Sequence, residues 1–234
     1  TVAANGADFG GGFYLYGARN STISNCTFTE NTANNDGGAI RFNYSSNSTI
    51  SNCTFTENKA TGFGGGIYLR DTLNLTITNC ILWKDDLSEI SYESEENAPA
   101  IMFSIIRGGY PGLGNMNADP LFIGGDPFNC HLLPDSPCID AGTTEGAPTT
   151  DMDGNPRPSG AAVDMGADEF YWPSVSTTFI SMPSRSFKAD DPASCSVSVW
   201  NAGTSALSGY SLFAILDVFG SYYFAPSFSD FDCF

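Results

Sequence analysis

Positive charge is scarce in this sequence. Its 234 residues hold nine Lys and Arg against 26 Asp and Glu, a formal net charge of -17. This charge repels nucleic-acid phosphates and anionic lipid headgroups, so nucleic acid is a poor partner. Apolar runs also fall short of the roughly 20 residues that a membrane-spanning helix needs. We therefore expect no nucleic-acid partner and no membrane span.

Patterns typical of surface helices are also lacking. Charged residues make up only 15% of the chain, whereas Gly occurs 25 times and Asn, Ser and Thr are frequent. Such a composition suits tight turns between short strands. The apolar fraction of 41% is ample for a buried core. The composition therefore predicts an all-β protein.

The two ends of the chain lack closing features. Thr1 is not preceded by an initiator Met or a signal segment, and Phe234 follows strand-like apolar residues. We expect both ends to be cuts within a longer protein. The last module is then incomplete, and export is inferred only indirectly.

One sequence pattern occurs three times. Thr-Ile-Ser-Asn-Cys-Thr-Phe at 22–28 returns at 49–55, and a looser copy stands at 76–82, each a step of 27 residues. A period of this length, with alternating apolar residues and no helical pattern, is typical of a solenoid whose coils stack as parallel strands. We therefore predict a parallel β-helix in which each copy supplies one layer.

A Gly-rich strand precedes each copy at the same step, with Phe13, Ile40 and Ile67 equivalent. The glycines ahead of these strands permit a corner with positive φ and a close approach between coils. Further along the period dissolves, although residues 89–92 and 100–106 still look like strands of one or two looser coils.

Side-chain directions within each copy follow from the strand period. Ile23, Cys26 and Phe28 are expected to point inward and Thr27 outward, with the alternation broken at Asn25, where the chain turns. The amides of equivalent turn residues should hydrogen-bond along a column and satisfy the backbone there. This column consists of Asn25, Asn52 and Asn79, and a second one of Asn31, Asn58 and Asp85.

Three of the seven cysteines, Cys26, Cys53 and Cys80, share one inward position on successive coils, roughly 4.8 Å apart. Parallel strands place their Cβ atoms side by side, which favours reduced thiols that fill the core. A metal held by three sulfurs is the alternative. Cys130 and Cys138 flank a turn and are candidates for a disulfide in an oxidising compartment.

Several motifs follow in order, among them Ser-Pro-Cys-Ile-Asp-Ala-Gly at 136–142, Asp-Met-Asp-Gly-Asn-Pro-Arg-Pro at 151–158 and Val-Asp-Met-Gly-Ala at 163–167. With the repeats, they resemble bacterial right-handed β-helix repeat proteins of the choice-of-anchor Q type. These are related to polymorphic outer-membrane repeat proteins and, more distantly, to pectate-lyase-like helices. The resemblance implies a right-handed helix, export, and attachment at the cell surface. Where relatives carry an aromatic residue in the last motif, this chain has Asp168.

The rest of the chain resembles the opening strands of an immunoglobulin-like module, with strands expected at 195–200 and 212–218. A complete module has about seven strands, so a partial β-sandwich is expected here. Cys195 and Cys233 either pair across its sheets or stay unpaired. The predicted domains are therefore residues 1–172, the β-helix with its closing segment, and residues 173–234, the partial β-sandwich.

Two groups of polar residues are candidate binding sites. Asp151, Asp153 and Asn155 share one tight loop, and Asp164 could join them from the returning strand, a set of oxygens that suits Ca²⁺. The alternative is a plain structural turn, paired with Arg157.

The second group is an outward ladder of Tyr14, Arg41 and Tyr68 on successive coils. Aromatic faces beside a guanidinium suit the rings of a sugar chain. The alternative is cation–π packing on a solvated surface.

No catalytic residue is assigned. Arg41 and Arg70 are the only plausible bases on the regular coils, and neither stands beside a row of stacked carboxylates. The single histidine, His131, is expected to be a core or turn residue. The leading hypothesis is a secreted or cell-surface scaffold, adhesin-like and non-catalytic, that contacts polysaccharide. The alternative is a polysaccharide lyase or glycosidase whose catalytic coils lie in a missing N-terminal part.

Overall fold

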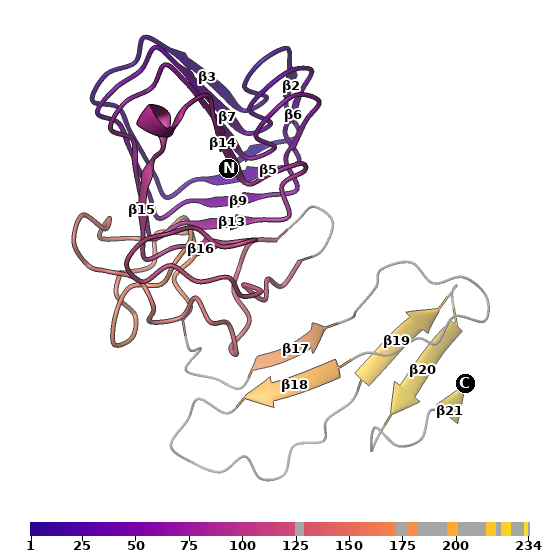
Figure 1. Ribbon diagram of the computed structural model, residues 1–234. Coiled ribbons are helices and arrows are strands. Elements are labelled where there is room, and N and C mark those ends of the chain that lie inside the picture. Colours follow the sequence, from indigo (N-terminus) through magenta and orange to yellow (C-terminus); the bar gives the residue numbers. More distant parts are fainter. Residues whose placement is uncertain are drawn as a thin grey trace. The chain divides into compact units, whose positions relative to one another are not determined.

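The computed structural model describes residues 1–124 and 129–171 in full, together with the backbone of five later strands at 177–181, 196–200, 214–218, 221–225 and 232–233. The chain splits into two compact units, Thr1–Tyr171 and Trp172–Phe234. The first unit is a parallel β-solenoid of about four coils (Figure 1). None of the helices in the described residues is long and apolar enough to cross a membrane.

The coils of the solenoid share one order of short strands. After β1 (Val2–Ala3) and β2 (Gly6–Ala7), the first coil contains β3 (Phe13–Tyr16), β4 (Thr22–Ser24), β5 (Thr27–Thr29) and β6 (Thr32–Ala33). The second contains β7 (Ile40–Asn43), β8 (Thr49–Ser51), β9 (Thr54–Thr56) and β10 (Lys59–Ala60). The third contains β11 (Ile67–Arg70), β12 (Thr76–Thr78) and β13 (Ile81–Trp83). The fourth contains β14 (Ile90–Tyr92), a 3-10 turn at Glu95–Asn97, β15 (Ala100–Met102) and β16 (Ile105–Ile106).

Equivalent strands pair in parallel and form four sheets along the solenoid. Their orders are β1-β5-β9-β13-β16, β10-β6-β2, β14-β11-β7-β3 and β15-β12-β8-β4. The predicted register is confirmed, because Phe13 pairs with Ile40 and Ile40 with Ile67. The fourth coil breaks the 27-residue step, since Ile67 pairs with Ile90, which is 23 residues on.

The core of the solenoid is built from the predicted inward positions. Phe28 and Phe55 are fully buried, with their rings stacked at 4.8 Å between centroids. Cys26, Cys53 and Cys80 are free thiols, as expected for core fillers. Burial raises the pKa of Cys53 well above its ordinary value, which disfavours the thiolate form that a metal would need.

Glycines ahead of the long strands let the coils approach one another. A Cβ on Gly38 would lie 2.1 Å from the carbonyl oxygen of Gly65, and one on Gly65 would lie 2.0 Å from that of Asp86. Neither position therefore has space for a side chain. Gly37 and Gly64 precede these residues with φ of 72° and 63°, the positive values predicted for the corner.

Residues 114–124 and 129–171, here called the closing segment, cover the outer face of the sheet that contains β9 and β13. Ile81 and Ile105 point out of the solenoid and pack with Leu132, Met165 and other residues of the closing segment in a second hydrophobic cluster. Figure 1 shows this segment, in rose to orange, beside β13 and β16. Thr54 was expected to face solvent beside its neighbouring Cys53, but this cover leaves it fully buried.

In the second unit, β17 (Thr177–Ser181) pairs antiparallel with β18 (Ser196–Trp200). A separate sheet joins β19 (Ala214–Val218), β20 (Ser221–Ala225) and β21 (Asp232–Cys233) in antiparallel order. Strands expected at 195–200 and 212–218 are thus present as β18 and β19, whereas an immunoglobulin-like sandwich stays a prediction. Cys195 and the side chain of Cys233 lie outside the described residues, so their pairing stays a prediction too.

Candidate functional site

The turn asparagines hold the closing segment against the solenoid. Asn25, Asn52 and Asn79 adopt the left-handed conformation, with φ of 51°, 48° and 54°, which Asn tolerates better than most residues. The predicted bond along the column exists at one step, where the Asn79 amide donates to Asn52 at 3.3 Å. The other amides were expected to continue the column, but they donate to the closing segment instead. Asn25 reaches the carbonyl of Thr150, and Asn52 that of Asp164.

The turn asparagine of the third coil makes the most of these contacts. The Asn79 side chain donates to the carbonyl of Thr143 at 2.7 Å and accepts its N–H at 2.8 Å. In addition, the N–H of Gly166 donates to the Asn79 carbonyl at 2.8 Å. Both the side chain and the backbone of this turn are therefore satisfied by the closing segment.

The second asparagine column runs unbroken. Asn5 donates to Asn31, Asn31 to Asn58, and Asn58 to Asp85, with donor–acceptor distances of 2.9, 2.9 and 2.8 Å. Asn31, Asn58 and Asp85 are buried. The prediction of hydrogen bonds along this column is therefore confirmed.

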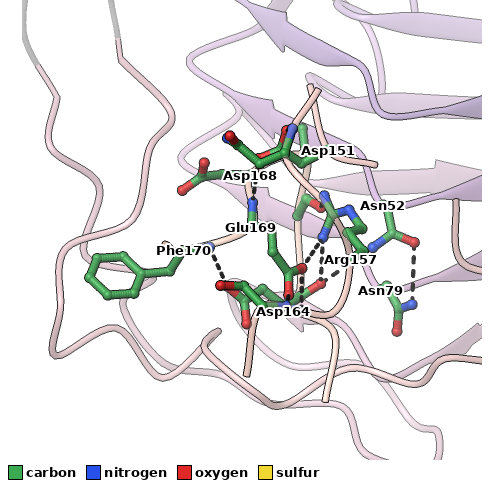
Figure 2. A network of polar contacts seen from close by, with 12 residues as sticks. Asn52, Asn79, Asp151, Arg157, Asp164, Asp168, Glu169 and Phe170 are labelled. Carbon is green, nitrogen blue, oxygen red and sulfur yellow. Dashed lines mark hydrogen bonds and ion pairs between the residues drawn. The ribbon is translucent and has the colours of Figure 1, made fainter. Parts of the chain in front are cut away.

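A buried ion pair organises the closing segment, as Figure 2 shows. Arg157 Nη1 lies 2.7 Å from Glu169 Oε2, and both side chains are inaccessible to solvent. Glu169 also accepts the N–H groups of Ser159 and Asp164. Arg157 donates further to the carbonyl of Gly166 at 2.9 Å. The carboxylate that pairs with Arg157 is therefore Glu169, and not one from the Asp151 loop.

The predicted calcium ligands have protein partners in this network. Asp151 accepts the N–H groups of Asp153 and Asn155 on one oxygen, and the Asn155 amide on the other. Burial opposes ionisation of Asp151, but these hydrogen bonds outweigh it and lower its pKa. Asp164 accepts the N–H groups of Asp140 and Phe170, at 2.7 and 2.6 Å. This geometry favours the structural turn, and calcium binding stays a prediction.

A different set of possible metal ligands does converge in the described residues. Atoms of His131, Asp153 and Asp168 lie within 4.8 Å of one another. His131 Nε2 is 2.5 Å from Asp153 Oδ2, and the other ring nitrogen contacts Asn129. The histidine side chain is 38% exposed, so of the two expected positions, core or turn, the core position is wrong. Burial raises the pKa of Asp168 to about 6.

Cys130 and Cys138 do not form the candidate disulfide. Both are buried free thiols, and burial raises the pKa of each to about 12. Cys138 packs in the second hydrophobic cluster.

The outward ladder on β3, β7 and β11 has the predicted register. Tyr14 and Tyr68 both pair with Arg41, whose guanidinium carbon lies 5.7 and 5.4 Å from their ring centroids. However, Arg41 is only 4% exposed and Tyr68 only 9%. Arg41 also forms an ion pair with Asp36 at 2.9 Å. Only Tyr14 of the three therefore offers much of its ring to solvent.

Two further aromatic residues cover this ladder. Phe9 lies over the Arg41 guanidinium at 4.1 Å, and Phe63 stacks on Tyr68 at 6.1 Å. Neither residue was among the predicted ladder positions, although the repeat contains the signal. Phe9, Asp36 and Phe63 follow the same 27-residue step, each five residues before a ladder position. The column of Phe9, Asp36 and Phe63 thus has the same order of residue types, aromatic, charged and aromatic, as the ladder.

Together with two tyrosines nearby, these residues form an exposed surface that we call the aromatic face. Tyr16 and Tyr44 contact each other at 5.6 Å. The exposed members are Phe9 (37%), Tyr14 (45%), Tyr16 (66%), Tyr44 (52%) and Phe63 (62%).

The sequence comparison agrees with this architecture. A family model described as "Right handed beta helix region" matches residues 3–113. This part of the chain is a right-handed β-helix. The matched β-helix spans the four coils and ends where the closing segment begins. Neither a curated protein nor a solved structure matches the chain significantly.

Proposed function

We propose that the chain is part of a non-catalytic extracellular or cell-surface scaffold, adhesin-like in character, that binds polysaccharide through its aromatic face. The observation that carries this proposal is the group of exposed rings on stacked coils. A contiguous apolar surface of this kind is uncommon on soluble proteins unless it contacts a partner. The surface location rests on the resemblance to bacterial cell-surface β-helix proteins.

The chemistry of the aromatic face suits a sugar chain. Rings such as Tyr14 and Phe63 give large, rigid contact areas at little cost in conformational entropy, and tyrosine adds a hydroxyl for hydrogen bonding. The Tyr14 hydroxyl already accepts a hydrogen bond from Asn43 at 3.0 Å, which orients the ring. The charge of Arg41 is balanced by Asp36. Arg41 therefore adds no unbalanced charge to the face, and an uncharged glycan, unlike an anionic one, is not repelled by the net charge of -17.

The catalytic alternative receives less support from the same residues. The two arginines considered as bases both lie close to carboxylates, Arg41 to Asp36 and Arg70 to Asp71 and Glu93. A general base must be deprotonated and within reach of the substrate, whereas a guanidinium stays protonated in proteins. Neither arginine is therefore suited to act as the base of a lyase.

A panel of neutral oligosaccharides tests the proposal by calorimetry. We expect the double variant Tyr14→Ala/Phe63→Ala to bind at least about tenfold more weakly than the wild type, because two stacking surfaces are lost. Tyr171→Ala is the matched control, since this exposed tyrosine belongs to the closing segment. Equal binding by the double variant and the wild type, or release of unsaturated products from a polyuronate by the wild type, would overturn the proposal.

A further inference from the structure

A recess lies on the β-helix where the repeat breaks. Thr56 and Trp83 are equivalent, as are Ile67 and Ile90. From Thr56 to Ile67 the chain advances by 11 residues. From Trp83 to Ile90, the equivalent connection one coil later, it advances by only seven. Within residues 1–124, the third coil contributes no strand to the sheet β10-β6-β2. The missing length leaves a cavity of about 560 Å³ beside β10.

Three consecutive coils each supply a cation to this recess. Lys59 comes from the second coil, Lys84 from the third and Arg107 from the fourth. In the described residues these three side chains form no ion pair, whereas Arg41 and Arg157 both do. A cluster of unpaired cations is unexpected in a chain of net charge -17, since carboxylates are abundant. Their mutual repulsion would be relieved by a bound anion.

Two buried carboxyl groups, Asp85 and Glu89, also line the recess, exposed by only 4% and 6%. Asp85 Oδ1 accepts hydrogen bonds from Asn58, but Oδ2 is buried without a partner. Burial raises the pKa of Asp85 well above its ordinary range and that of Glu89 to about 7. Below neutral pH Glu89 therefore retains its proton, and burial favours the neutral form of Asp85 as well. When Asp85 and Glu89 are neutral, the exposed Asp86 is the one negative charge in the lining, against three cations.

We propose that this recess binds an anionic group, carboxylate or sulfate, of an acidic glycan. The inference extends the proposed polysaccharide function and rests on it, but it uses a separate site. Lys59, Lys84 and Arg107 would contact the anion, while the aromatic face would contact uncharged rings. The glycine at 108, which also lines the recess, adds no side chain to its wall.

Calorimetry with three oligosaccharides of equal length tests the recess: an oligogalacturonate, a sulfated dextran oligomer and a neutral dextran oligomer. We expect Lys84→Gln/Arg107→Gln to weaken binding of one or both acidic probes at least about tenfold and to leave the neutral probe unaffected. The comparison between galacturonate and sulfate identifies which anion is preferred. Arg185→Gln/Lys188→Gln is the control, because it changes the net charge equally at two residues that belong to the second unit, whereas the residues that line the recess belong to the first.

The outcomes separate the two proposals. If the neutral probe binds the wild type but the acidic probes gain nothing over it, the recess is wrong and the polysaccharide function stands. If no probe binds, both fail. Equal losses in the recess variant and its control would also overturn the inference, since they would show only long-range attraction. Circular dichroism of each variant establishes that it is folded.

A pH series adds a second readout. Lys84, Arg107, Asp85 and Asp86 surround Glu89 in the recess. As Glu89 loses its proton, negative charge appears among the cations, so affinity for the acidic probe should fall between about pH 6 and pH 8. Glu89→Gln should make this decline smaller, because Asp85, whose pKa is also raised, is still present. A wild-type affinity independent of pH would contradict the inferred recess.

Discussion

The hydroxyl of Thr54 accepts a hydrogen bond from the N–H of Ala167 at 3.0 Å, which joins the second coil to a residue 113 positions later. Both residues are fully buried. We expect Thr54→Val to lower the free energy of unfolding by about 1–3 kcal/mol, because the Ala167 N–H loses its acceptor without gaining water. Urea unfolding followed by circular dichroism measures this change.

Thr56→Val is the matched control for this substitution. Thr56 lies on the same strand, is equally buried, and its hydroxyl has no hydrogen-bond partner. Its replacement by the isosteric valine should therefore leave stability unchanged or raise it slightly. A loss at Thr56 as large as that at Thr54 would show that the effect arises from packing rather than from the bond to Ala167.

Replacing only one partner of the buried Arg157–Glu169 ion pair should strongly lower the free energy of unfolding. Arg157→Met leaves the Glu169 carboxylate without its cation, and we expect a loss of about 3–5 kcal/mol in unfolding free energy. Adding Glu169→Gln should recover part of it, since the buried charge is then gone. Arg70→Met is the exposed comparison, because its nearest Glu93 oxygen lies at 3.7 Å, and should cost under about 1 kcal/mol. Equal losses at the two arginines would contradict this account.

The Asn31–Asn58–Asp85 column should contribute strongly to the stacking of coils. Asn58 donates to Asp85 and to the carbonyl of Phe28, and accepts from the backbone and side chain of Asn31. Asn58→Ala should therefore cost at least about 2 kcal/mol in chemical denaturation, since several buried groups lose their partners. Asn34→Ala removes an exposed hydrogen bond between the Asn34 side-chain amide and Asp8, and should change the free energy of unfolding little. Comparable losses would refute the proposed role of burial.

Stability should fall as the pH rises from about 4 to about 7. Burial raises the pKa of Asp164 and Glu89 to about 7 and that of Asp168 to about 6, from ordinary values of 3.8 to 4.5. The folded state therefore holds protons that the unfolded chain has released, and this contribution is complete below about pH 4 and lost through the folded pKa. Each pKa unit corresponds to about 1.4 kcal/mol.

Melting temperatures between about pH 4.5 and pH 8 measure the effect of these carboxyls. We expect a steady decline, and a smaller one in Glu89→Gln. Asp151 acts in the opposite sense, because its lowered pKa removes stability only as the pH falls below its ordinary value of 3.8. A melting temperature that stays level or rises toward pH 8 would exclude the proposed protonated carboxyls.

The solenoid was predictable because its signal is periodic. Phe13, Ile40 and Ile67 stand in register because every coil must bury the same inward positions. The fourth coil was only partly predictable, since a shortened connection moves Ile90 to a step of 23. A repeat search cannot align a coil whose length has changed, although the strand around Ile90 is visible from its apolar residues.

The candidate sites were less predictable, because they depend on contacts between distant segments. No feature of Thr54 or Asn52 reveals that the closing segment covers them. Likewise, His131 meets Asp153 only because two turns of that segment fold together. The aromatic face was accessible in principle, since Phe9 and Phe63 obey the period of the ladder.

The contacts of the turn asparagines have a consequence for how the β-helix opens. Stacked repeats usually fray from their ends, one unit after another, because each unit touches only its neighbours. Here the closing segment bonds to the turn asparagines of three successive coils. Its residues Thr150, Asp164 and Thr143 accept hydrogen bonds from Asn25, Asn52 and Asn79, respectively. These three coils are thereby coupled into one cooperative unit, and their amide hydrogens should exchange at similar rates rather than along a gradient.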